Sequence, residues 1–210
     1  MSSNIARQAI FNRQNQRIGY ELLFRDGRCD TFPLVAAEYA TEIVLNDLFV
    51  SGKTAVRTVS DGQPCFVNFS YQSLINGTAL NYPPKDLVIE VLENCVPDTV
   101  LFDVLVDLKS RGYRIAFDDF NPCDAWRPFL PLADIVKIDF RALSRETISR
   151  FVLAYKSAPE LLLLAEKIET AEELLFARKL GFDLFQGYQL SKPERIPFSG
   201  VIEHIAEHVA

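Results

Sequence analysis

The stretch Arg114-Ile-Ala-Phe-Asp-Asp-Phe120 is a short apolar run that ends in two adjacent carboxylates, Asp118 and Asp119. A run of this length and composition indicates a buried strand. Two neighbouring carboxylates at the end of such a strand repel each other, and they are costly to ionise unless a cation or a proton compensates them. Aspartate also favours turns, where its side chain bonds the local backbone. The pair by itself therefore fits either a turn or a cation site.

Similar apolar runs recur along the chain and alternate with helical patterns. After an N-terminal hairpin at 5–13 and 18–25, strands are predicted at 65–70, 87–93, 114–120, 135–140, 161–168 and 183–190. Apolar residues at helical spacing predict helices at 33–49, 99–111, 145–156, 171–180 and 202–209. Such alternation implies parallel βαβ units, and about eight strands imply a closed barrel. We therefore predict an α/β fold, a modified TIM-type (β/α)8 barrel with an antiparallel first strand, as a single domain over residues 1–210; a doubly wound sheet is the alternative.

The composition is that of an ordinary globular protein. Hydrophobic residues make up 49% of the chain and charged residues 24%, which is enough apolar material for a large core. The net charge of −6, without a dense Lys/Arg cluster, argues against binding to duplex nucleic acid or to an anionic membrane. The cysteines lie far apart and form no C-x-x-C pair, which indicates reduced thiols. No apolar run approaches the roughly 20 residues that span a bilayer, so we expect a cytoplasmic protein.

Each predicted strand after the first carries polar or charged side chains, and barrels of this class build their sites at the C-terminal ends of the strands. These side chains are Glu21, Asn68, Glu90, Asp118 with Asp119, Lys137, Glu166 and Gln186. Because an isolated buried charge costs several kcal/mol, we expect them to share one site. Their oxygens, with no Cys or His, suit Mg²⁺ or Mn²⁺ and fit structural zinc poorly. The carboxylates exceed the needs of one octahedral ion and predict a two-metal centre that hydrolyses a phosphoester, with one Asp as the bridge.

The segments that hold these residues resemble, in order, the motifs of the EAL family of cyclic di-GMP phosphodiesterases. Tyr20-Glu-Leu-Leu-Phe-Arg25 resembles the family's Glu-x-Leu-x-Arg signature. The later matches are Val67-Asn-Phe-Ser70, Ile89-Glu-Val-Leu-Glu93, Asp118-Asp-Phe120, Val136-Lys-Ile-Asp139, Ala165-Glu-Lys-Ile-Glu-Thr170, Phe185-Gln-Gly-Tyr188 and Ser191-Lys-Pro193. Each motif alone is weak, but together they cover nearly the whole chain in register.

The resemblance implies a role for each residue. The implied metal ligands are Glu21, Asn68, Glu90, Asp118, Asp119 and Glu166, with Asp118 bridging two ions. The implied catalytic residues are Lys137, Glu166 and Gln186, of which Lys137 and Gln186 position the attacking water. Arg25 would grip a substrate phosphate through its guanidinium fork, and Glu93 and Glu169 would support the site. From the residues alone, Arg25 as a surface arginine and Lys137 as a structural partner for a carboxylate remain alternatives.

The chain departs from the family pattern at two places. Asn121-Pro-Cys-Asp-Ala-Trp126 stands where active members carry a glycine-rich loop tied to metal occupancy and dimerisation, and Lys167-Ile168 stands in place of Gly-Val. Pro122 fixes φ where glycine would be free, and Trp126 is expected to seek burial. Lys167-Ile168 and the opening from Arg7 to Arg13 resemble the branch in which an EAL domain is joined to an HDOD domain, a branch that is often degenerate.

Two functions follow from the sequence. The first is a phosphodiesterase that hydrolyses cyclic di-GMP to linear diguanylate with Mg²⁺ or Mn²⁺ at a two-ion site. The second is a catalytically degenerate EAL domain that senses cyclic di-GMP or binds a protein partner, which the replaced loop favours. Another metal-dependent barrel enzyme, with Lys137 as a base, is a third alternative. A homodimer is compatible with each of them.

Overall fold

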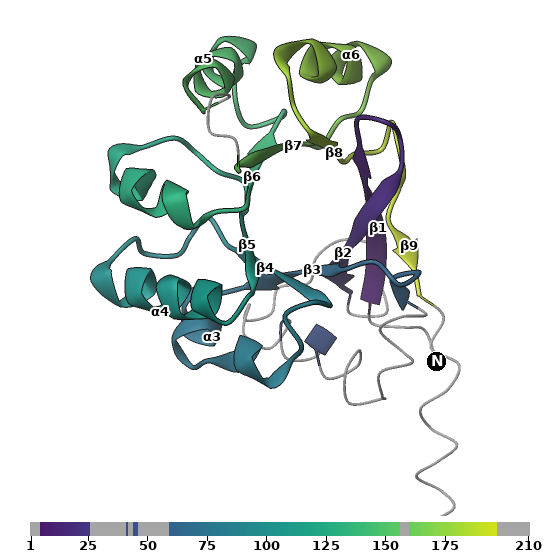
Figure 1. Cartoon of the computed structure of the whole chain (residues 1–210). Helices are drawn as coiled ribbons and strands as arrows, with labels where there is room; N and C mark the ends of the chain where they lie inside the picture. The colour runs from purple at the N-terminus through teal and green to yellow at the C-terminus, as the bar shows by residue number, and fades with distance from the viewer. Residues whose placement is uncertain (1–4, 26–40, 42–43, 46–58, 156–159, 197–210) are drawn as a thin grey trace, which may run out of the picture.

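The strands close into a barrel, seen in Figure 1 as a ring. The computed structural model describes residues 5–25, 41, 44–45, 59–155 and 160–196. β1 (Ile5–Asn12) runs antiparallel to both of its neighbours in the ring, β2 (Arg17–Phe24) and β8 (Leu184–Phe185). The strands between β2 and β8 are parallel and follow chain order: β3 (Cys65–Phe69), β4 (Leu87–Val91), β5 (Arg114–Phe117), β6 (Ile135–Asp139) and β7 (Leu162–Glu166). A barrel with an antiparallel first strand is therefore confirmed.

Helices cover the outside of the ring (Figure 1). The described helical segments are α3 (Tyr71–Ile75), the 3-10 turn η1 (Thr78–Asn81), α4 (Thr99–Ser110), the 3-10 segment η2 (Asp124–Leu132), α5 (Arg145–Tyr155) and α6 (Ala171–Leu180). The predicted helices at 99–111, 145–156 and 171–180 are confirmed. Most of the predicted helix at 33–49, and all of the one at 202–209, lie outside the described residues. A short strand, β9 (Glu194–Arg195), pairs with β1 on the outer side of the hairpin.

The helices begin and end where the sequence supplies caps. Asp98 accepts a hydrogen bond from Leu101 N at 2.9 Å, which satisfies one of the free N–H groups at the start of α4. Thr170 and Glu173 form a capping box at the start of α6. Gly181 ends α6 with a φ of 106°, a conformation that glycine adopts without strain.

The interior of the barrel is filled by a layer of apolar side chains, one from nearly every strand. This inner layer consists of Ile10, Phe66, Val88, Ala116, Ile135, Leu164 and Leu184. Gly19 faces the largest of them, and a Cβ there would lie 2.6 Å from the Phe66 ring. Small and large residues thus alternate to fill the interior, which makes it a packed floor rather than a channel. A second, larger core lies between the strands and the helices that cover them.

Three predicted strands are shorter than expected because the backbone turns sharply after their ends. β5 ends at Phe117, and Asp119 has a φ of 40°. β7 ends at Glu166, and the next residue, Lys167, has a φ of 54°. β8 ends at Phe185, and Gly187 has a φ of 149°. A residue with positive φ leaves the extended conformation that a ladder needs. The predicted strands at 114–120, 161–168 and 183–190 were therefore too long at their C-terminal ends.

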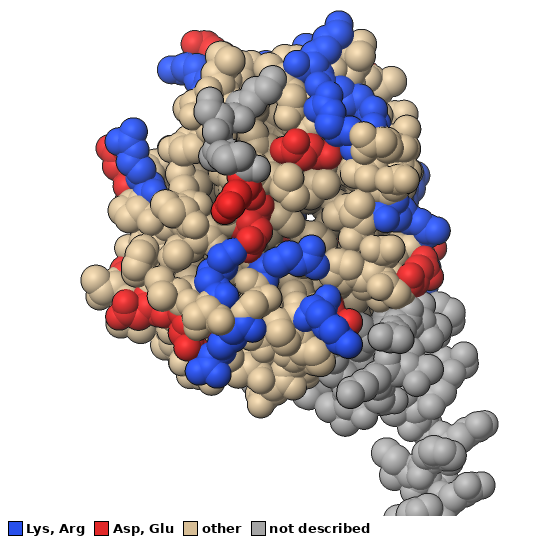
Figure 2. All heavy atoms as spheres, viewed as in Figure 1, with Lys and Arg blue, Asp and Glu red and all other residues tan. Residues whose placement is uncertain are grey.

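The surface carries charges of both signs. On the face seen in Figure 2, Lys and Arg side chains are interspersed with Asp and Glu around the rim, without one continuous basic area. Among the helices of the described part of the chain, none has the length and apolar character needed to span a membrane.

Candidate active site

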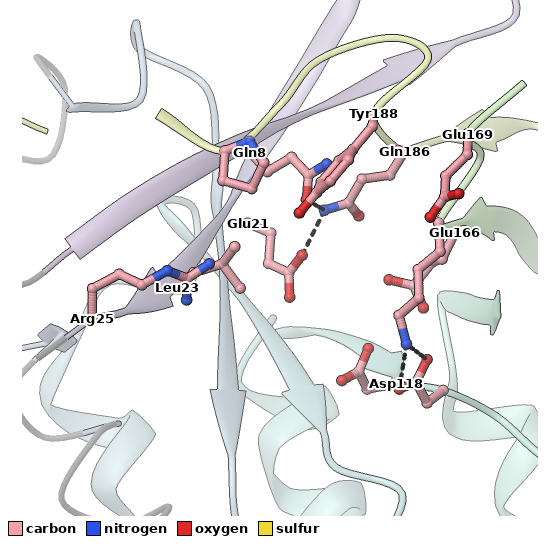
Figure 3. A pocket seen from close by; sticks show the side chains of 13 residues that line it. Gln8, Glu21, Leu23, Arg25, Asp118, Glu166, Glu169, Gln186 and Tyr188 are labelled. Carbon is pink, nitrogen blue, oxygen red and sulfur yellow. Dashed lines mark hydrogen bonds and ion pairs between the residues drawn. The ribbon is translucent and has the colours of Figure 1, made fainter. Parts of the chain in front are cut away.

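The predicted site residues lie one level above the inner layer, at the C-terminal mouth of the barrel. Side chains alternate along a strand, so the residue two positions after an inward-facing one also faces inward. The pairs related in this way are Phe66 and Asn68, Val88 and Glu90, Ala116 and Asp118, Ile135 and Lys137, Leu164 and Glu166, and Leu184 and Gln186. The apolar layer is thus the floor of the site, and these polar residues stand on it. Figure 3 shows Glu21 and Gln186 on one side of the mouth and Asp118 and Glu166 on the other.

Lys137 occupies the centre of this polar level and is fully buried. Its Nζ lies 2.5 Å from Glu90 Oε1, 2.6 Å from Asp118 Oδ1 and 2.9 Å from Glu166 Oε1. Glu21 Oε1 lies farther away, at 3.7 Å. Burial alone lowers the pKa of Lys137, but the surrounding carboxylates outweigh burial and hold that pKa well above its ordinary value. The ammonium is therefore charged and offsets part of the negative charge of the site.

Two of the buried carboxyls bind protons readily. Burial raises the pKa of Glu90 well above its ordinary range, although Lys137 opposes the shift. The pKa of Glu166 is raised in the same way, first by burial and then by neighbouring carboxylates that include Asp118. A buried carboxyl with a raised pKa is suited to accept a proton during a reaction at neutral pH.

Several buried oxygens of the site have no hydrogen-bond partner among the described residues. They are Asn68 Oδ1, Glu90 Oε1 and Oε2, Glu166 Oε2 and Gln186 Oε1. Glu90 Oε1 does form the 2.5 Å ion pair with Lys137, but without the angle of a hydrogen bond. Every atom in this set is an acceptor, and buried acceptors without donors are costly unless a cation satisfies them. The donor set of carboxylate and amide oxygens therefore fits a hard divalent cation.

Gln186 forms hydrogen bonds with both strands of the N-terminal hairpin, β1 and β2. Its Nε2 donates to Glu21 Oε2 at 2.5 Å and to Gln8 Oε1 at 3.2 Å. Gln8 is buried on β1 and donates in turn to Ser191 O at 2.9 Å. These bonds hold the Glu21 carboxylate facing the site (Figure 3). Gln186 thus has an orienting contact with a predicted metal ligand.

Asp119 lies beside Asp118 but belongs to a different set of contacts. Glu93, Asp118 and Asp119 offer carboxylate oxygens that lie within 4.8 Å of one another. Both carboxylate oxygens of Asp119 also accept from Lys167 Nζ, each at 3.0 Å. The structure therefore brings Asp119 to the site, as predicted, but already paired with a cationic side chain.

The mouth opens into a cavity of about 330 Å³, a volume within the range of small-molecule sites. Arg25 lines it just beyond β2, with its side chain buried and its Nη1 donating to Phe24 O at 2.8 Å. Arg25 is therefore not a surface arginine, which was one of its two interpretations. Glu169 also lines the cavity, but its side chain is exposed and pairs with Arg141 at 3.3 Å. Tyr188 is an exposed aromatic at the same rim.

The replaced loop packs against the strand that carries Asp118. The Trp126 ring lies between Phe117 at the end of β5 and Phe129, with 5.2 Å between ring centroids in each case. Trp126 is half-buried rather than buried, since it also lines a smaller hollow beside Glu93 and Asp118. The second half of the replaced loop thus forms the start of η2, beside Glu93 and Asp118.

Comparison with known proteins identifies the family. A model of the EAL domain family matches residues 63–193. The chain belongs to this family. Over 196 residues it is 42% identical to the cyclic di-GMP phosphodiesterase CdgJ of Vibrio cholerae, covering 91% of this chain and 44% of that protein. Over 198 residues it is 36% identical to the uncharacterized protein YuxH of Bacillus subtilis, covering 91% of this chain and 47% of that protein.

The EAL fold is also found in solved structures. The Bacillus subtilis YkuI protein, with an EAL domain and in complex with c-di-GMP and calcium, has a TM-score of 0.70 at 23% identity, covering 93% of this chain and 55% of that one. At this identity the similarity concerns the fold. The chain spans about half the length of the curated relatives it matches.

Three residues of this EAL domain take part in the contacts around the predicted site residues but were missed from the sequence. They are Gln8, Asp139 and Lys167. Gln8 could have been found, because it stands two positions before the inward-facing Ile10 on β1, which runs antiparallel to its neighbours. Asp139 could also have been found, because it stands two positions after the inward-facing Lys137 on β6. Lys167 follows no such alternation, since its positive φ places its side chain outside the strand pattern.

Proposed function

We propose that this EAL domain is a divalent-metal-dependent phosphodiesterase that hydrolyses cyclic di-GMP to linear diguanylate. The observation that carries the proposal is the ring of buried acceptor oxygens around Lys137 at the barrel mouth. Such a set has no role in a packed core, where each oxygen would lack a partner. The relative CdgJ, whose name is that of a cyclic di-GMP phosphodiesterase, supports the choice of substrate.

Glu21, Asn68, Glu90 and Asp118 would hold the cation, for which Mg²⁺ or Mn²⁺ is proposed. When bound there, such an ion supplies a Lewis acid that acidifies water and neutralises phosphate charge. The calcium in the YkuI complex supports a hard divalent ion at this kind of site. The resemblance also implies a second ion, held by Asp118 together with Asp119 and Glu166. In the structure, both oxygens of Asp119 already accept from Lys167.

The chain's own residues supply the remaining chemistry. Glu166 Oε2 is buried without a donor, and the raised pKa of Glu166 suits it to take the proton of the attacking water. Lys137 orients the Glu166 carboxylate through its 2.9 Å contact and keeps positive charge close to the reacting phosphate. Arg25, at the edge of the cavity, would bind a phosphate oxygen through its guanidinium.

The degenerate alternative is less well supported. It rested on the replaced loop at 121–126, yet that segment packs through Trp126 against Phe117 without displacing Asp118. A sensor also has no need for a buried lysine with carboxylates arranged around it at 2.5 to 2.9 Å. The cytoplasmic location and the single domain over residues 1–210 stay predictions from the sequence. The homodimer and the protein partner also stay predictions.

Turnover of cyclic di-GMP tests the proposal directly. The purified chain would be incubated with cyclic di-GMP and Mn²⁺ or Mg²⁺, and linear diguanylate would be followed by chromatography. We expect product with the wild-type chain and a rate at least a hundredfold lower with Glu21→Gln, which keeps the shape of the side chain but removes its charge. Tight binding without turnover would support the sensor instead.

A matched variant separates loss of the site from loss of the fold. Glu172→Gln makes the same chemical change on the exposed surface of α6, where Glu172 pairs with Arg145 at 2.7 Å. We expect Glu172→Gln to retain wild-type turnover. Both variants should show the same circular dichroism spectrum as the wild-type chain, because neither residue belongs to the apolar core.

A further inference from the structure

Lys167 bridges two acidic residues at the mouth of the barrel. Its Nζ donates to both oxygens of Asp119 at 3.0 Å and to Asp139 Oδ2 at 2.6 Å. Asp119 follows β5, Asp139 ends β6 and Lys167 follows β7, so the contact ties three consecutive strand ends together. The ammonium thus lies in front of both carboxylate oxygens of Asp119.

The backbone on both sides of this contact is in an uncommon conformation. Asp119 has a φ of 40° and Lys167 a φ of 54°, in the left-handed region that side chains other than Asn and Asp rarely adopt. Such a conformation persists only where the surrounding structure stabilises it. Here the left-handed turn directly after Glu166 brings the Lys167 side chain across to Asp119 and Asp139.

Displacing this ammonium would leave a buried carboxylate without its partner. The Asp139 side chain is only 9% exposed, whereas that of Lys167 is 47% exposed. Asp139 Oδ1 accepts from Arg141 N at 2.5 Å, and its other oxygen, Oδ2, accepts from Lys167. An ion bound to Asp119 would therefore be repelled by the nearby Lys167 ammonium. If it displaced the ammonium instead, the buried Asp139 carboxylate would lose its compensating charge.

We propose that the Lys167 ammonium takes the place of a second divalent cation beside Asp119, so that this chain binds a single divalent cation at the barrel mouth. The inference rests on the proposed function, since it concerns the same metal site. The first position differs from the second in its free acceptors: Asn68 Oδ1 and Glu90 Oε2 have no hydrogen-bond partner among the described residues. Both Asp119 oxygens, by contrast, are already engaged. Glu166 Oε2 also lacks a partner, so the difference lies in Asp119, which has no oxygen left for a cation.

Counting bound Mn²⁺ tests the inference without any turnover. Mn²⁺ would be titrated into the purified chain, free of nucleotide, with bound ions counted by electron paramagnetic resonance and by calorimetry. We expect saturation at one Mn²⁺ per chain for the wild type. Lys167→Gly should bind two, because glycine accepts the left-handed backbone and removes the ammonium.

Two further variants complete the design. Lys167→Met removes the charge while keeping most of the side chain, and it should also bind two ions, so the result does not depend on the glycine variant folding. Lys109→Met removes a lysine that pairs with Asp134 at 2.6 Å, on the opposite end of the β6 strand, and should stay at one. Folding of each variant would be checked by circular dichroism.

The outcomes decide the inference. A wild-type chain that saturates at any number other than one overturns it, and so do Lys167 variants that fold and stay at one. Turnover of cyclic di-GMP is read separately, so failure of the proposed function is distinguishable. A chain that binds one ion and hydrolyses nothing contradicts the function alone, whereas a chain that binds two ions and hydrolyses contradicts the inference alone.

Discussion

Gln186 donates a 2.5 Å hydrogen bond to Glu21 although 165 residues separate them in the chain. The contact exists because β1 lies between β2 and β8 and closes the ring. The bond joins the residues of β2 and of the segment after β8 across the intervening strand β1. Gln8 on β1 also accepts from Gln186, at 3.2 Å. The orientation of the Glu21 carboxylate thus depends on the closure of the barrel.

Removing the Gln186 amide should weaken cation binding. In Gln186→Ala the Glu21 carboxylate loses its orienting donor, and loss of such a contact typically lowers metal affinity by about 10- to 100-fold. Calorimetric titration with Mn²⁺ would measure the change. Gln189→Ala, an exposed glutamine in the same segment, is the control and should match the wild type. Equal affinities for the two variants would mean that Glu21 is oriented without Gln186.

Removing the central lysine should destabilise the metal-free chain. Lys137→Met leaves Glu90, Asp118 and Glu166 without their shared cation, and breaking a buried ion pair from one side costs about 3–5 kcal/mol. Urea denaturation in the presence of EDTA would give the free energy of unfolding. Lys109→Met breaks a partly exposed pair and should cost about 1 kcal/mol or less.

The response to added Mn²⁺ sharpens this prediction. If the carboxylates are destabilising only because their charges are uncompensated, a divalent cation should restore part of the lost free energy of unfolding in Lys137→Met. The same addition should leave the loss in Lys109→Met unchanged. A Lys137→Met chain as stable as Lys109→Met in EDTA would contradict the central role of the ammonium.

The pH dependence of stability should follow from Glu90. Burial raises its pKa in the folded chain above the unfolded value, so the folded state binds the proton more tightly. The free energy of unfolding of the metal-free chain therefore falls as pH rises from the ordinary glutamate pKa of about 4.3 toward the raised value. Glu90→Gln cannot ionise and should lose less stability between pH 5 and pH 8. Denaturation in EDTA at both pH values measures this, with the exposed Glu160→Gln as control.

The inner layer and the residues above it could be predicted from the sequence because both obey the same alternation. Glu90, Lys137 and Glu166 each stand inside an apolar run, and a parallel barrel brings such positions to one level. The contact of Lys167 with Asp119 could not be predicted in this way. It joins residues 48 apart through turns with positive φ, and neither periodicity nor composition records the direction of such a turn.

Gly187 follows Gln186 and packs on the turn that carries Lys167. A Cβ at this position would lie 2.2 Å from both the N and the O of Ile168, and the φ of 149° is one that other residues rarely adopt. Backbone atoms cannot move aside as a flexible side chain can, so Gly187→Ala should shift the two turns apart. We expect a loss of stability well above that of Gly62→Ala, together with weaker Mn²⁺ binding.

Gly62→Ala is the matched control because it isolates the conformational part of the cost. Gly62 also has a positive φ, 77°, but a Cβ there would meet no atom within 4 Å. Left-handed strain alone costs about 1–2 kcal/mol, so any larger loss in Gly187→Ala measures the clash with Ile168 together with the added strain of its φ of 149°. Urea denaturation of both variants gives this difference. Equal losses would show that the Ile168 and Gly187 turns separate freely, in which case Mn²⁺ affinity should also be unchanged.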